Sequence, residues 1–417
     1  MSVRRFSCFT AALHELADWL KQCGIETVAM ESTGVYWIPL FQILETSGLE
    51  VKLVNARHVQ TVPGRKSDVM DCQWLRQLHS YGLLSGSFRP NDEICVLRSY
   101  IRQRDTLIQS AAAHIQRMQK ALTQMNVQLH RVISDITGMT GLAILRAIVS
   151  GERDLAKLAA LKNARIKATH EEISAALNGD YRSELVFILA QELQLYDIFQ
   201  TQISACDVQI EQCLNQFSDQ VDVEQSPLPA AKRPRKKPTG NAPNFDLSTH
   251  LYRISGVDFT QVDGLGALTV LTLLSELGLD STRFPSAKQF VSWLGLCPGS
   301  RITGGKSKSA KTRQVANRVA KAFRMAAQSL ARSQSALGAF YRKMKARMGP
   351  PKAITATAHK LARIFYALWT SGQSYVDPGV DAYEQQYQER TLKNLKKKAL
   401  ALGFDLVPAT PTPEGVS

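Results

Sequence analysis

The sequence lacks the paired cysteines of a zinc site and the long apolar run of a membrane helix. Its seven cysteines are scattered, none forms a C-x-x-C pair, and the eight histidines do not cluster beside them. We therefore expect no zinc site and reduced, mostly packed cysteines. No run of about 18 apolar residues is present, and no apolar signal core follows MSVRRFSCF. These absences predict a cytoplasmic protein without a transmembrane helix.

The sequence has fewer acidic residues than basic ones. In 417 residues, 51 Lys and Arg stand against 36 Asp and Glu, which gives a net charge of +15. A surplus of this size indicates a polyanionic partner, nucleic acid first and an anionic membrane surface second. The hydrophobic fraction of 44% supplies ample material for a core. The length predicts two or three domains.

Residues 1–93 alternate short helix and strand patterns, which predicts an α/β layer with helices packed on a sheet. Residues 25–30 and 49–54 predict two strands, and Glu31 follows the first strand directly. Ser67 is expected to cap a helix that begins SDVMDCQWLRQL.

Residues 94–218 predict a long helical arm. The stretch VLRSYIRQRDTLIQSAAAHIQRMQKALTQM has helical periodicity and almost no glycine or proline, and a second helical stretch covers roughly 183–217. Together they predict an antiparallel helical hairpin or coiled coil. The pattern leaves two roles open, a spacer between domains and an assembly arm that pairs subunits.

Three further segments complete the chain. Residues 219–247 form a linker whose core, SPLPAAKRPRKKPTGNAPN, is either a semi-extended tether or a basic clamp on a nucleic-acid backbone. Residues 248–376 predict a mostly helical domain, in which Gly264 and Gly266 precede the helix ALTVLTLLSEL. Such a turn is typical of helix-hairpin-helix DNA-binding units, although many tight turns share its pattern. Residues 377–417 predict a charged helix and a disordered tail.

Three carboxylates are candidate metal ligands. Asp68 and Asp71 are three residues apart at the start of a predicted helix, so they share one face. Glu31 ends a strand, where α/β sheets place functional side chains. Converging carboxylates need a cation, and hard oxygen ligands suit Mg²⁺ or Mn²⁺, which can stabilise the oxygens of a reacting phosphodiester. The plainer interpretation is that the two aspartates only complement the helix dipole.

A basic segment with two glycines is the second candidate site. In SRITGGKSKS, Thr303 precedes Gly304 and Gly305, and Lys306 and Lys308 follow. The glycines allow close approach of a DNA backbone, and the lysines can hold its phosphate while an activated hydroxyl attacks. The alternative is a phosphate-binding loop without a covalent role. The helix predicted after this segment carries further cations, Lys311, Arg313, Arg318, Lys321 and Arg324.

Two blocks of motifs cover much of the chain. The first holds MESTGVYW (30–37), PGRKSDVMDCQWL (63–75) and LHSYGLL (78–84). The second holds GLGALTVLTLLSELG (264–278), RFPSAKQFVSWLGLCP (283–298) and TGGKSKSAK (303–311). Together they resemble the DEDD-type insertion-sequence transposases, which include the bridge-RNA-guided recombinases and are related to the Piv invertases.

The resemblance implies an RNase H-like N-terminal domain similar to Holliday-junction resolvases, a helical arm, and a C-terminal domain with a serine nucleophile. It implies DNA strand cleavage and exchange by transesterification, with Mg²⁺ or Mn²⁺ in the acidic site. In this setting Glu31, Asp68 and Asp71 match the family's second, third and fourth acidic residues.

The partners that the resemblance implies are DNA, a structured guide RNA and further copies of the chain, as a dimer or tetramer, with no membrane. The expected location is the bacterial cytoplasm, at the nucleoid. The expected nucleic-acid contacts are Arg65, Lys66, Gly304, Gly305, Lys306, Lys308, Lys311 and Arg313.

The chain departs from the family pattern in two places. The family's first aspartate lies on a strand that precedes a segment like VRRFSCF, and this chain begins at that segment. We therefore expect an N-terminally truncated copy or a misplaced start codon. The family's nucleophile is usually Ser before Gly-Gly, whereas Thr303 stands here, with a methyl group that crowds attack and restricts χ1.

Three functions are compatible with these residues. The first is a transposase or site-specific recombinase that forms a covalent protein–DNA intermediate. The second is a catalytically impaired remnant that only binds DNA or RNA, which the missing aspartate favours. The third is a junction-resolving nuclease that uses water as its nucleophile. A covalent adduct that disappears in Thr303→Val would separate the first from the third.

Overall fold

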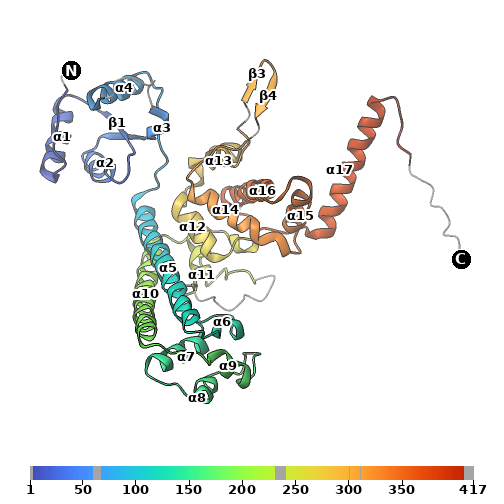
Figure 1. Cartoon of the computed structure of the whole chain (residues 1–417). Helices are drawn as coiled ribbons and strands as arrows, with labels where there is room; N and C mark the ends of the chain where they lie inside the picture. The colour runs from blue at the N-terminus through green and yellow to red at the C-terminus, as the bar shows by residue number, and fades with distance from the viewer. Residues whose placement is uncertain (1–2, 60–66, 231–240, 300, 310, 408–417) are drawn as a thin grey trace. The chain divides into compact units, whose positions relative to one another are not determined.

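The computed structural model describes residues 3–59, 67–230, 241–299, 301–309 and 311–407 (Figure 1). The chain divides into two compact units, Met1–Arg89 and Pro90–Ser417. Helices predominate among the described residues. None of these helices combines the length and the apolar character that a membrane crossing requires.

The first unit is built on a parallel pair of strands. Its elements are α1 (Thr10–Gln22), β1 (Thr27–Glu31), α2 (Trp37–Thr46), β2 (Glu50–Val54), α3 (Ala56–Val59) and α4 (Asp68–Ser80). β1 and β2 run parallel, with Glu31 opposite Val54 at their carboxyl ends. Both predicted strands are confirmed, with small shifts at their ends.

Alternating side chains along β1 meet helices on both faces of this strand pair. Met30 belongs to a buried cluster that includes Leu44 of α2. Ala29 points to the other face, where it and Leu75 of α4 pack against a second buried cluster. Ser67 caps α4 as predicted, because its hydroxyl accepts a backbone N–H at 3.3 Å. Helices therefore enclose the strands in the α/β layer that the sequence predicts.

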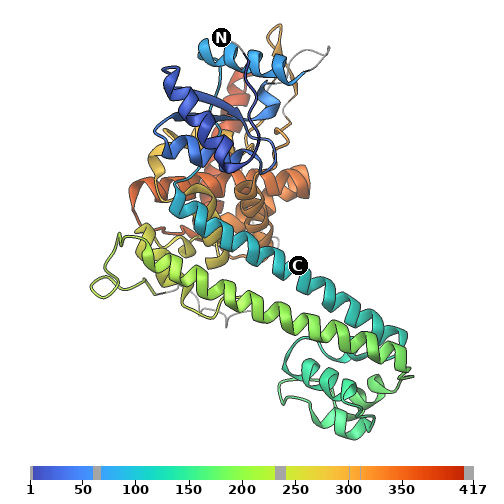
Figure 2. The same ribbon diagram turned by 90° about the vertical axis from the view of Figure 1, so that its left-hand side faces the viewer.

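The second unit begins with a helical arm. Its two long helices, α5 (Asp92–Gln124) and α10 (Ser183–Gln216), lie side by side (Figure 2). They run in opposite directions, since Arg104 pairs with Asp207 while His114, further along α5, pairs with the earlier residue Glu192. Both members of the Arg104–Asp207 pair are buried. A shift in helix register would leave either charge without its partner in apolar surroundings, so the pair disfavours other registers.

Four short helices that were not predicted from the sequence cover the far end of the arm. They are α6 (Leu129–Val132), α7 (Met139–Val149), α8 (Leu155–Ala160) and α9 (His170–Leu177). Their buried residues continue the core of the arm: Ile144 and Leu177 belong to one cluster with Leu122 of α5 and Leu189 of α10. The arm therefore ends in a packed tip rather than a simple turn.

The rest of the second unit is packed around α16. Its elements are α11 (Leu247–Ser255), α12 (Ala267–Leu277), α13 (Ala287–Trp293), β3 (Arg301–Thr303), β4 (Lys306–Ser309), α14 (Arg318–Ser329), α15 (Ala336–Met348), α16 (Pro350–Ser371) and α17 (Gly379–Ala401). Phe365 of α16 stacks on Phe259 with 4.5 Å between ring centroids and meets Phe323 of α14 at 5.7 Å. All three rings are fully buried, so they form the centre of this core.

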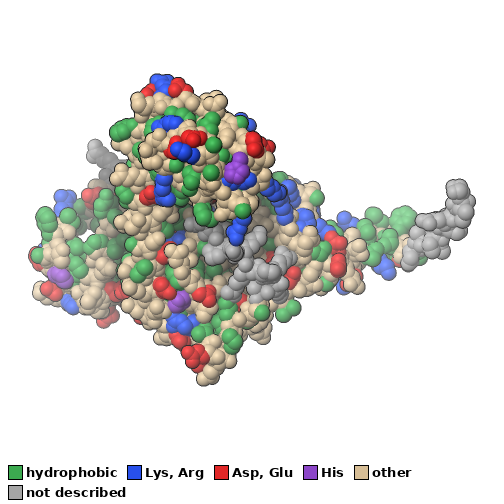
Figure 3. Space-filling model, turned by 90° about the horizontal axis from the view of Figure 1, so that it is seen from below, with side chains coloured by type: hydrophobic (Ala, Val, Ile, Leu, Met, Phe, Trp, Pro, Cys, Tyr) green, Lys and Arg blue, Asp and Glu red, His purple; other side chains and the backbone are tan. Residues whose placement is uncertain are grey.

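The positive charge of the chain is dispersed on the face shown in Figure 3, where Lys and Arg side chains are interspersed with acidic and apolar ones. Charge on that face alone therefore does not assign a binding site.

Candidate catalytic and nucleic-acid-binding sites

The three candidate carboxylates lie in the first unit, on β1 and α4. Glu31 is the last residue of β1, is exposed, and accepts a hydrogen bond from Thr33 Oγ1 at 2.8 Å. Asp68 is the first residue of α4 and is exposed, whereas Asp71, one turn later, is half-buried.

The orientation of α4 turns its N-terminus toward the end of β1. Near the start of the strand, the Thr27 hydroxyl and His79 Nε2 form a hydrogen bond of 2.9 Å. From His79 back to Asp71 the helix spans about 12 Å, and from Thr27 to Glu31 the strand spans about 13 Å. Since Leu75 packs on the sheet midway along the helix, the Asp71 end of α4 is directed toward the Glu31 end of β1.

The acidic residues also share a face with the residues that anchor α4. Asp68, Asp71, Leu75 and Leu78 follow one another at helical spacing, and both leucines pack toward the buried cluster of Val54. By donor type these carboxylates fit Mg²⁺ or Mn²⁺. Among the described residues, however, no three His, Cys, Asp or Glu side chains are grouped closely enough to hold a metal ion. The carboxylates thus lie at one end of the layer but are not closed into a metal site.

Thr303 lies at the tip of a β-hairpin, for which the sequence provided no strand prediction. β3 and β4 are antiparallel and pair Thr303 with Lys306. Gly304 and Gly305 connect them with φ of 57° and 72°, and left-handed values at both positions are those of the two-residue turn that suits a hairpin. A Cβ on either glycine would meet nothing within 4 Å. The hydroxyl therefore stands beside an open, side-chain-free turn.

The pairing of Thr303 with Lys306 places a cation beside the candidate nucleophile. Directly opposed residues of an antiparallel pair project to the same face, with Cβ atoms about 4.5–5.5 Å apart. Both residues are exposed. The Thr303 hydroxyl and the Lys306 ammonium can therefore meet one phosphate group from the same side.

The base of the hairpin is held by pairing that continues below the two strands. The Gly299 N–H donates to the Lys311 carbonyl at 2.8 Å, and Pro298 forms an antiparallel bridge with Thr312. Arg313 Nη2 then donates to the carbonyl oxygen of Ser292, in the last turn of α13, at 2.6 Å. These contacts fix the hairpin to the helical domain.

Only some of the remaining predicted nucleic-acid contacts lie among the described residues. Lys311 and Arg313 are exposed, but they precede α14 rather than lie on it. The prediction that they belong to that helix is wrong because Asn317 caps it, accepting the Ala320 N–H at 3.1 Å. Outside the described residues lie Arg65, Lys66 and the side chain of Lys308.

Close packing requires a glycine at the first glycine position of the turn before α12. Gly264 has a φ of 94°, and a Cβ there would lie 2.9 Å from the carbonyl oxygen of Ala326 in α14. Only glycine fits this close contact without strain. The helix-hairpin-helix interpretation of the turn stays a prediction.

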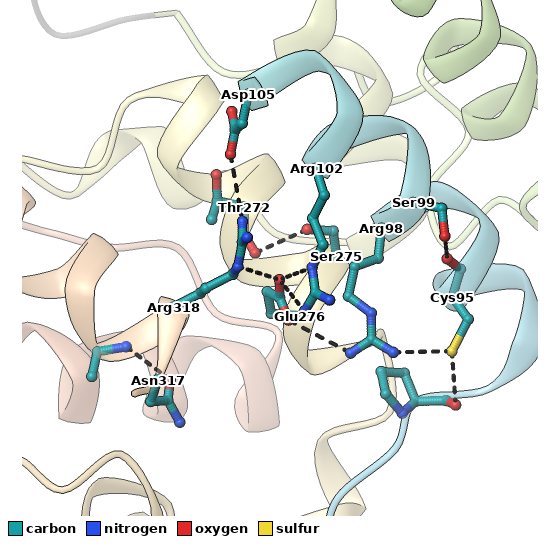
Figure 4. Close-up of polar contacts among 12 residues, drawn as sticks. Cys95, Arg98, Ser99, Arg102, Asp105, Thr272, Ser275, Glu276, Asn317 and Arg318 are labelled. Carbon is teal, nitrogen blue, oxygen red and sulfur yellow. Dashed lines mark hydrogen bonds and ion pairs between the residues drawn. The ribbon is translucent and has the colours of Figure 1, made fainter. Parts of the chain in front are cut away.

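Arg318, at the start of α14, belongs to an ion-pair network that joins the helical domain to the arm (Figure 4). It lies 3.8 Å from Asp105 of α5 and 4.0 Å from Glu276 of α12. Arg102 of α5 donates three hydrogen bonds of 2.8–3.0 Å to the Glu276 carboxylate, and Arg98 lies 3.5 Å from it. Burial raises the pKa of Asp105, and the positive charge of Arg318 opposes that rise.

Sequence patterns do not predict this network. Arg102 and Glu276 are 174 residues apart, and neither belongs to a local pattern that points to the other. Glu276 does stand at the end of an apolar helical run, TVLTLLSEL, where a charged residue in a largely buried stretch is the one available signal.

Two family models match the chain, and each covers one candidate site. A transposase model for DEDD transposases of the IS110 group matches residues 2–127, which include Glu31, Asp68 and Asp71. A model described as transposase IS116/IS110/IS902 family matches residues 258–342, which include Thr303 and the hairpin. A search of curated proteins finds no match. On these two matches, in the order and at the sites that the motifs predict, the chain belongs to the IS110 family of DEDD transposases.

Proposed function

We propose that this chain cleaves and rejoins DNA strands by transesterification, with Thr303 as the attacking hydroxyl. The observation that carries the proposal is the place of Thr303. It is exposed at a hairpin tip, beside two glycines that leave the approach open and across from Lys306. A hydroxyl held in this way can reach a phosphodiester in an extended strand.

In the cleavage step, Thr303 Oγ attacks the phosphorus atom and loses its proton to a base or to solvent. One P–O bond to the protein forms as one P–O bond to a sugar breaks, and the leaving sugar oxygen takes up a proton. Because the number of ester bonds is unchanged, a strand hydroxyl can reverse the step and join a new partner. Lys306 offsets the negative charge that grows on the phosphate oxygens.

The first unit is proposed to be the RNase H-like part of this enzyme, with Glu31, Asp68 and Asp71 as its acidic set. These residues would hold Mg²⁺ or Mn²⁺, which supplies charge neutralisation at the phosphodiester. Support comes from α4, which carries both aspartates on the face that packs toward the sheet and lies alongside β1.

The arm is proposed to pair subunits, as a dimer or tetramer, rather than to act only as a spacer. In support, α10 exposes large apolar side chains with no contact in the described chain to explain them. Their exposed fractions run from 39% to 62% at Phe187, Ile188, Leu195, Ile198 and Val208. Sedimentation of wild type against Leu195→Glu/Ile198→Glu tests this, and an unchanged mass would refute it.

The nucleic-acid partners are proposed to be DNA and a structured guide RNA at the bacterial nucleoid. The positive net charge supports a polyanionic partner of either kind. The basic run of the linker is the further candidate contact from the sequence, and its residues 231–240 lie outside the described part of the chain.

A second candidate function is nucleic-acid binding without strand cleavage. It is favoured by one observation, the absence of a closed group of three metal-binding side chains among the described residues. The two candidates differ in whether a covalent product forms, so one experiment separates them.

That experiment incubates the chain with labelled DNA of the element's ends and Mg²⁺, followed by denaturing electrophoresis. We expect a DNA adduct that is lost in Thr303→Val and kept in Thr303→Ser. Thr391→Val, on the exposed helix α17, is the matched control and should retain the adduct. Binding without any adduct in wild type would support the second candidate, and cleavage that survives in Thr303→Val would support the nuclease alternative.

A further inference from the structure

Three cationic side chains from three separate elements act on the thiol of Cys297, at the base of the β3–β4 hairpin. They are Lys288 of α13, Arg313 of the segment after β4, and Arg363 of α16, and we call them the root cluster. All three are exposed. In the described part of the chain, none of the three is joined to a carboxylate by an ion pair.

The hydrogen bonds of the hairpin base bring Arg313 to the side of α13 that carries Lys288. Arg313 Nη2 donates to the carbonyl oxygen of Ser292 at 2.6 Å. Lys288 and Ser292 are four residues apart in the same helix, so they lie on one face. The Arg313 guanidinium is therefore held one helical turn from the position of Lys288.

The third cation comes from the face of α16 that packs on α13. Tyr366 of α16 lies 5.6 Å from the Phe290 ring of α13 and donates its hydroxyl proton to the carbonyl oxygen of Phe284 at 2.6 Å. Arg363 precedes Tyr366 by three residues and shares its face. The packing of the two helices thus directs Arg363 toward α13 as well.

The surroundings of Cys297, at the end of the segment that leads into the hairpin, agree with this convergence. Burial raises the pKa of the Cys297 thiol, while Arg313, Arg363 and Lys288 together act to lower it. His359 lies one turn before Arg363 on the same face, and both burial and the charge of Arg363 lower the pKa of its imidazole. No carboxylate contributes to either shift. The electrostatic field at the hairpin base is therefore positive.

We propose that the root cluster is a phosphate-binding subsite for the DNA strand that Thr303 attacks, at a fixed distance from the attacked phosphate. Two planar guanidiniums and an ammonium are suited to phosphate oxygens, because each guanidinium can donate two parallel hydrogen bonds. Like charges that lack acidic partners repel one another, and a bound phosphate removes that repulsion. The proposal rests on the proposed function of Thr303 only for the identity of the strand.

The hairpin sets the distance between the two sites. Its paired positions run from Thr303 with Lys306 at the tip to Pro298 with Thr312 at the base. Five residues of extended strand span about 16 Å. One DNA strand rises about 3.4 Å per nucleotide. A strand that follows the hairpin therefore places a phosphate about five nucleotides from the attacked one at the root cluster.

The first test measures binding without chemistry. The affinity of the Thr303→Val chain for a mixed-sequence duplex is measured over a range of salt concentrations, with and without Lys288→Gln/Arg363→Gln. We expect the slope of log affinity against log salt to fall by about 0.9 for each phosphate that the variant no longer neutralises. The matched control is Arg146→Gln/Lys157→Gln at the arm tip, which removes the same charge from residues already paired with Asp197 and Glu152.

Equal slopes in the two double variants, with unchanged unfolding midpoints, would overturn the proposal. Arg363→Lys in place of Arg363→Gln should restore about half of the lost slope, since it returns one of the two removed charges. A second readout is alkylation of Cys297, followed by mass spectrometry. The duplex should slow it in the parent chain and leave it unaffected in Lys288→Gln/Arg363→Gln, and a rate insensitive to DNA in the parent would contradict the proposal.

The second test locates the phosphate. Single phosphates of the labelled strand are replaced by neutral methylphosphonates, and adduct formation by the chain with Thr303 intact is measured. We expect the adduct yield to fall when the neutral position lies about five nucleotides from the attacked phosphate. This fall should be absent in Lys288→Gln/Arg363→Gln. Equal yields at all positions would refute the spacing. If Thr303 is not the nucleophile, no adduct forms, but the salt dependence of binding can still be measured. Failure of the proposed function is therefore distinguishable from failure of the proposed phosphate subsite.

Discussion

Replacing Glu276 by Gln should destabilise the joint between the arm and the helical domain. The Glu276 side chain is only 11% exposed, and three arginines surround it: Arg98, Arg102 and Arg318. The substitution keeps the shape of the side chain and removes its charge. Three guanidiniums then remain close together without the carboxylate that offsets their repulsion.

The size of the effect follows from how buried each partner is. Removing one member of a fully buried ion pair costs about 3–5 kcal/mol. Arg102 and Arg318 are 44% and 53% exposed, which weakens their share, whereas Arg98 is 19% exposed. Solvent-exposed pairs contribute at most about 1 kcal/mol. We therefore expect a loss of about 2–3 kcal/mol in the free energy of unfolding of the second unit.

The assay is urea unfolding of the full chain with Trp19, Trp37 and Trp74 replaced by Phe. Its fluorescence then comes from Trp293 and Trp369, which belong to this helical domain. Glu184→Gln is the matched control, because Glu184 is 53% exposed and its ion pair is with a neighbouring arginine on the surface. It should change stability by less than about 0.5 kcal/mol. A loss in Glu276→Gln no larger than in this control would refute the reasoning.

Three further predictions concern the hairpin turn, the stability of the chain at acidic pH and the N-terminal cap of α9. Gly304→Ala/Gly305→Ala should strain the hairpin by about 1–2 kcal/mol per residue and reduce adduct formation while Thr303 is unchanged; full adduct yield would contradict the turn geometry. Burial and neighbouring arginines lower the pKa values of His250 and His359 below 6.5, so the unfolded chain binds protons first as pH falls. Stability should therefore decline below pH 6.5 and decline less in His250→Gln/His359→Gln; identical pH profiles in urea unfolding would contradict this. Thr169→Ala removes the capping box of α9 and should lower the stability of the arm tip by about 1 kcal/mol. Hydrogen exchange of the tip measures this loss, and unchanged protection would contradict it.

Local patterns allowed the sequence to predict the helical arm and the strands of the first unit. Helical periodicity without glycine or proline is a property of neighbouring residues, so α5 and α10 were predictable. Ser67 as a cap was predictable for the same reason, since the capping hydrogen bond spans three residues.

The hairpin and the root cluster were not predicted, for two different reasons. The strands RIT and KSKS lack the alternation of apolar and polar residues that marks a half-buried strand, although the Gly-Gly pair between them is a hairpin signal. Lys288, Arg313 and Arg363 converge only because α13, the hairpin base and α16 pack together. No spacing rule connects residues so far apart in the chain.

The acidic set shows the same limit. The sequence spacing correctly gave Asp68 and Asp71 one helix face, but their distance from Glu31 depends on how α4 packs on β1. That packing is decided by Leu75, Leu78 and the Thr27–His79 hydrogen bond.

The paired helices also give the arm a defined length. The 33 residues of α5 correspond to about 50 Å, which matches about 15 base pairs at a rise of about 3.4 Å each. The buried Arg104–Asp207 pair disfavours sliding of the helices, so one length of the arm is favoured. Seven residues added to each helix would advance the tip by about 10 Å and turn it by only about 20°. Any contact that the tip makes on DNA would then move by about three base pairs along the groove while keeping nearly the same direction.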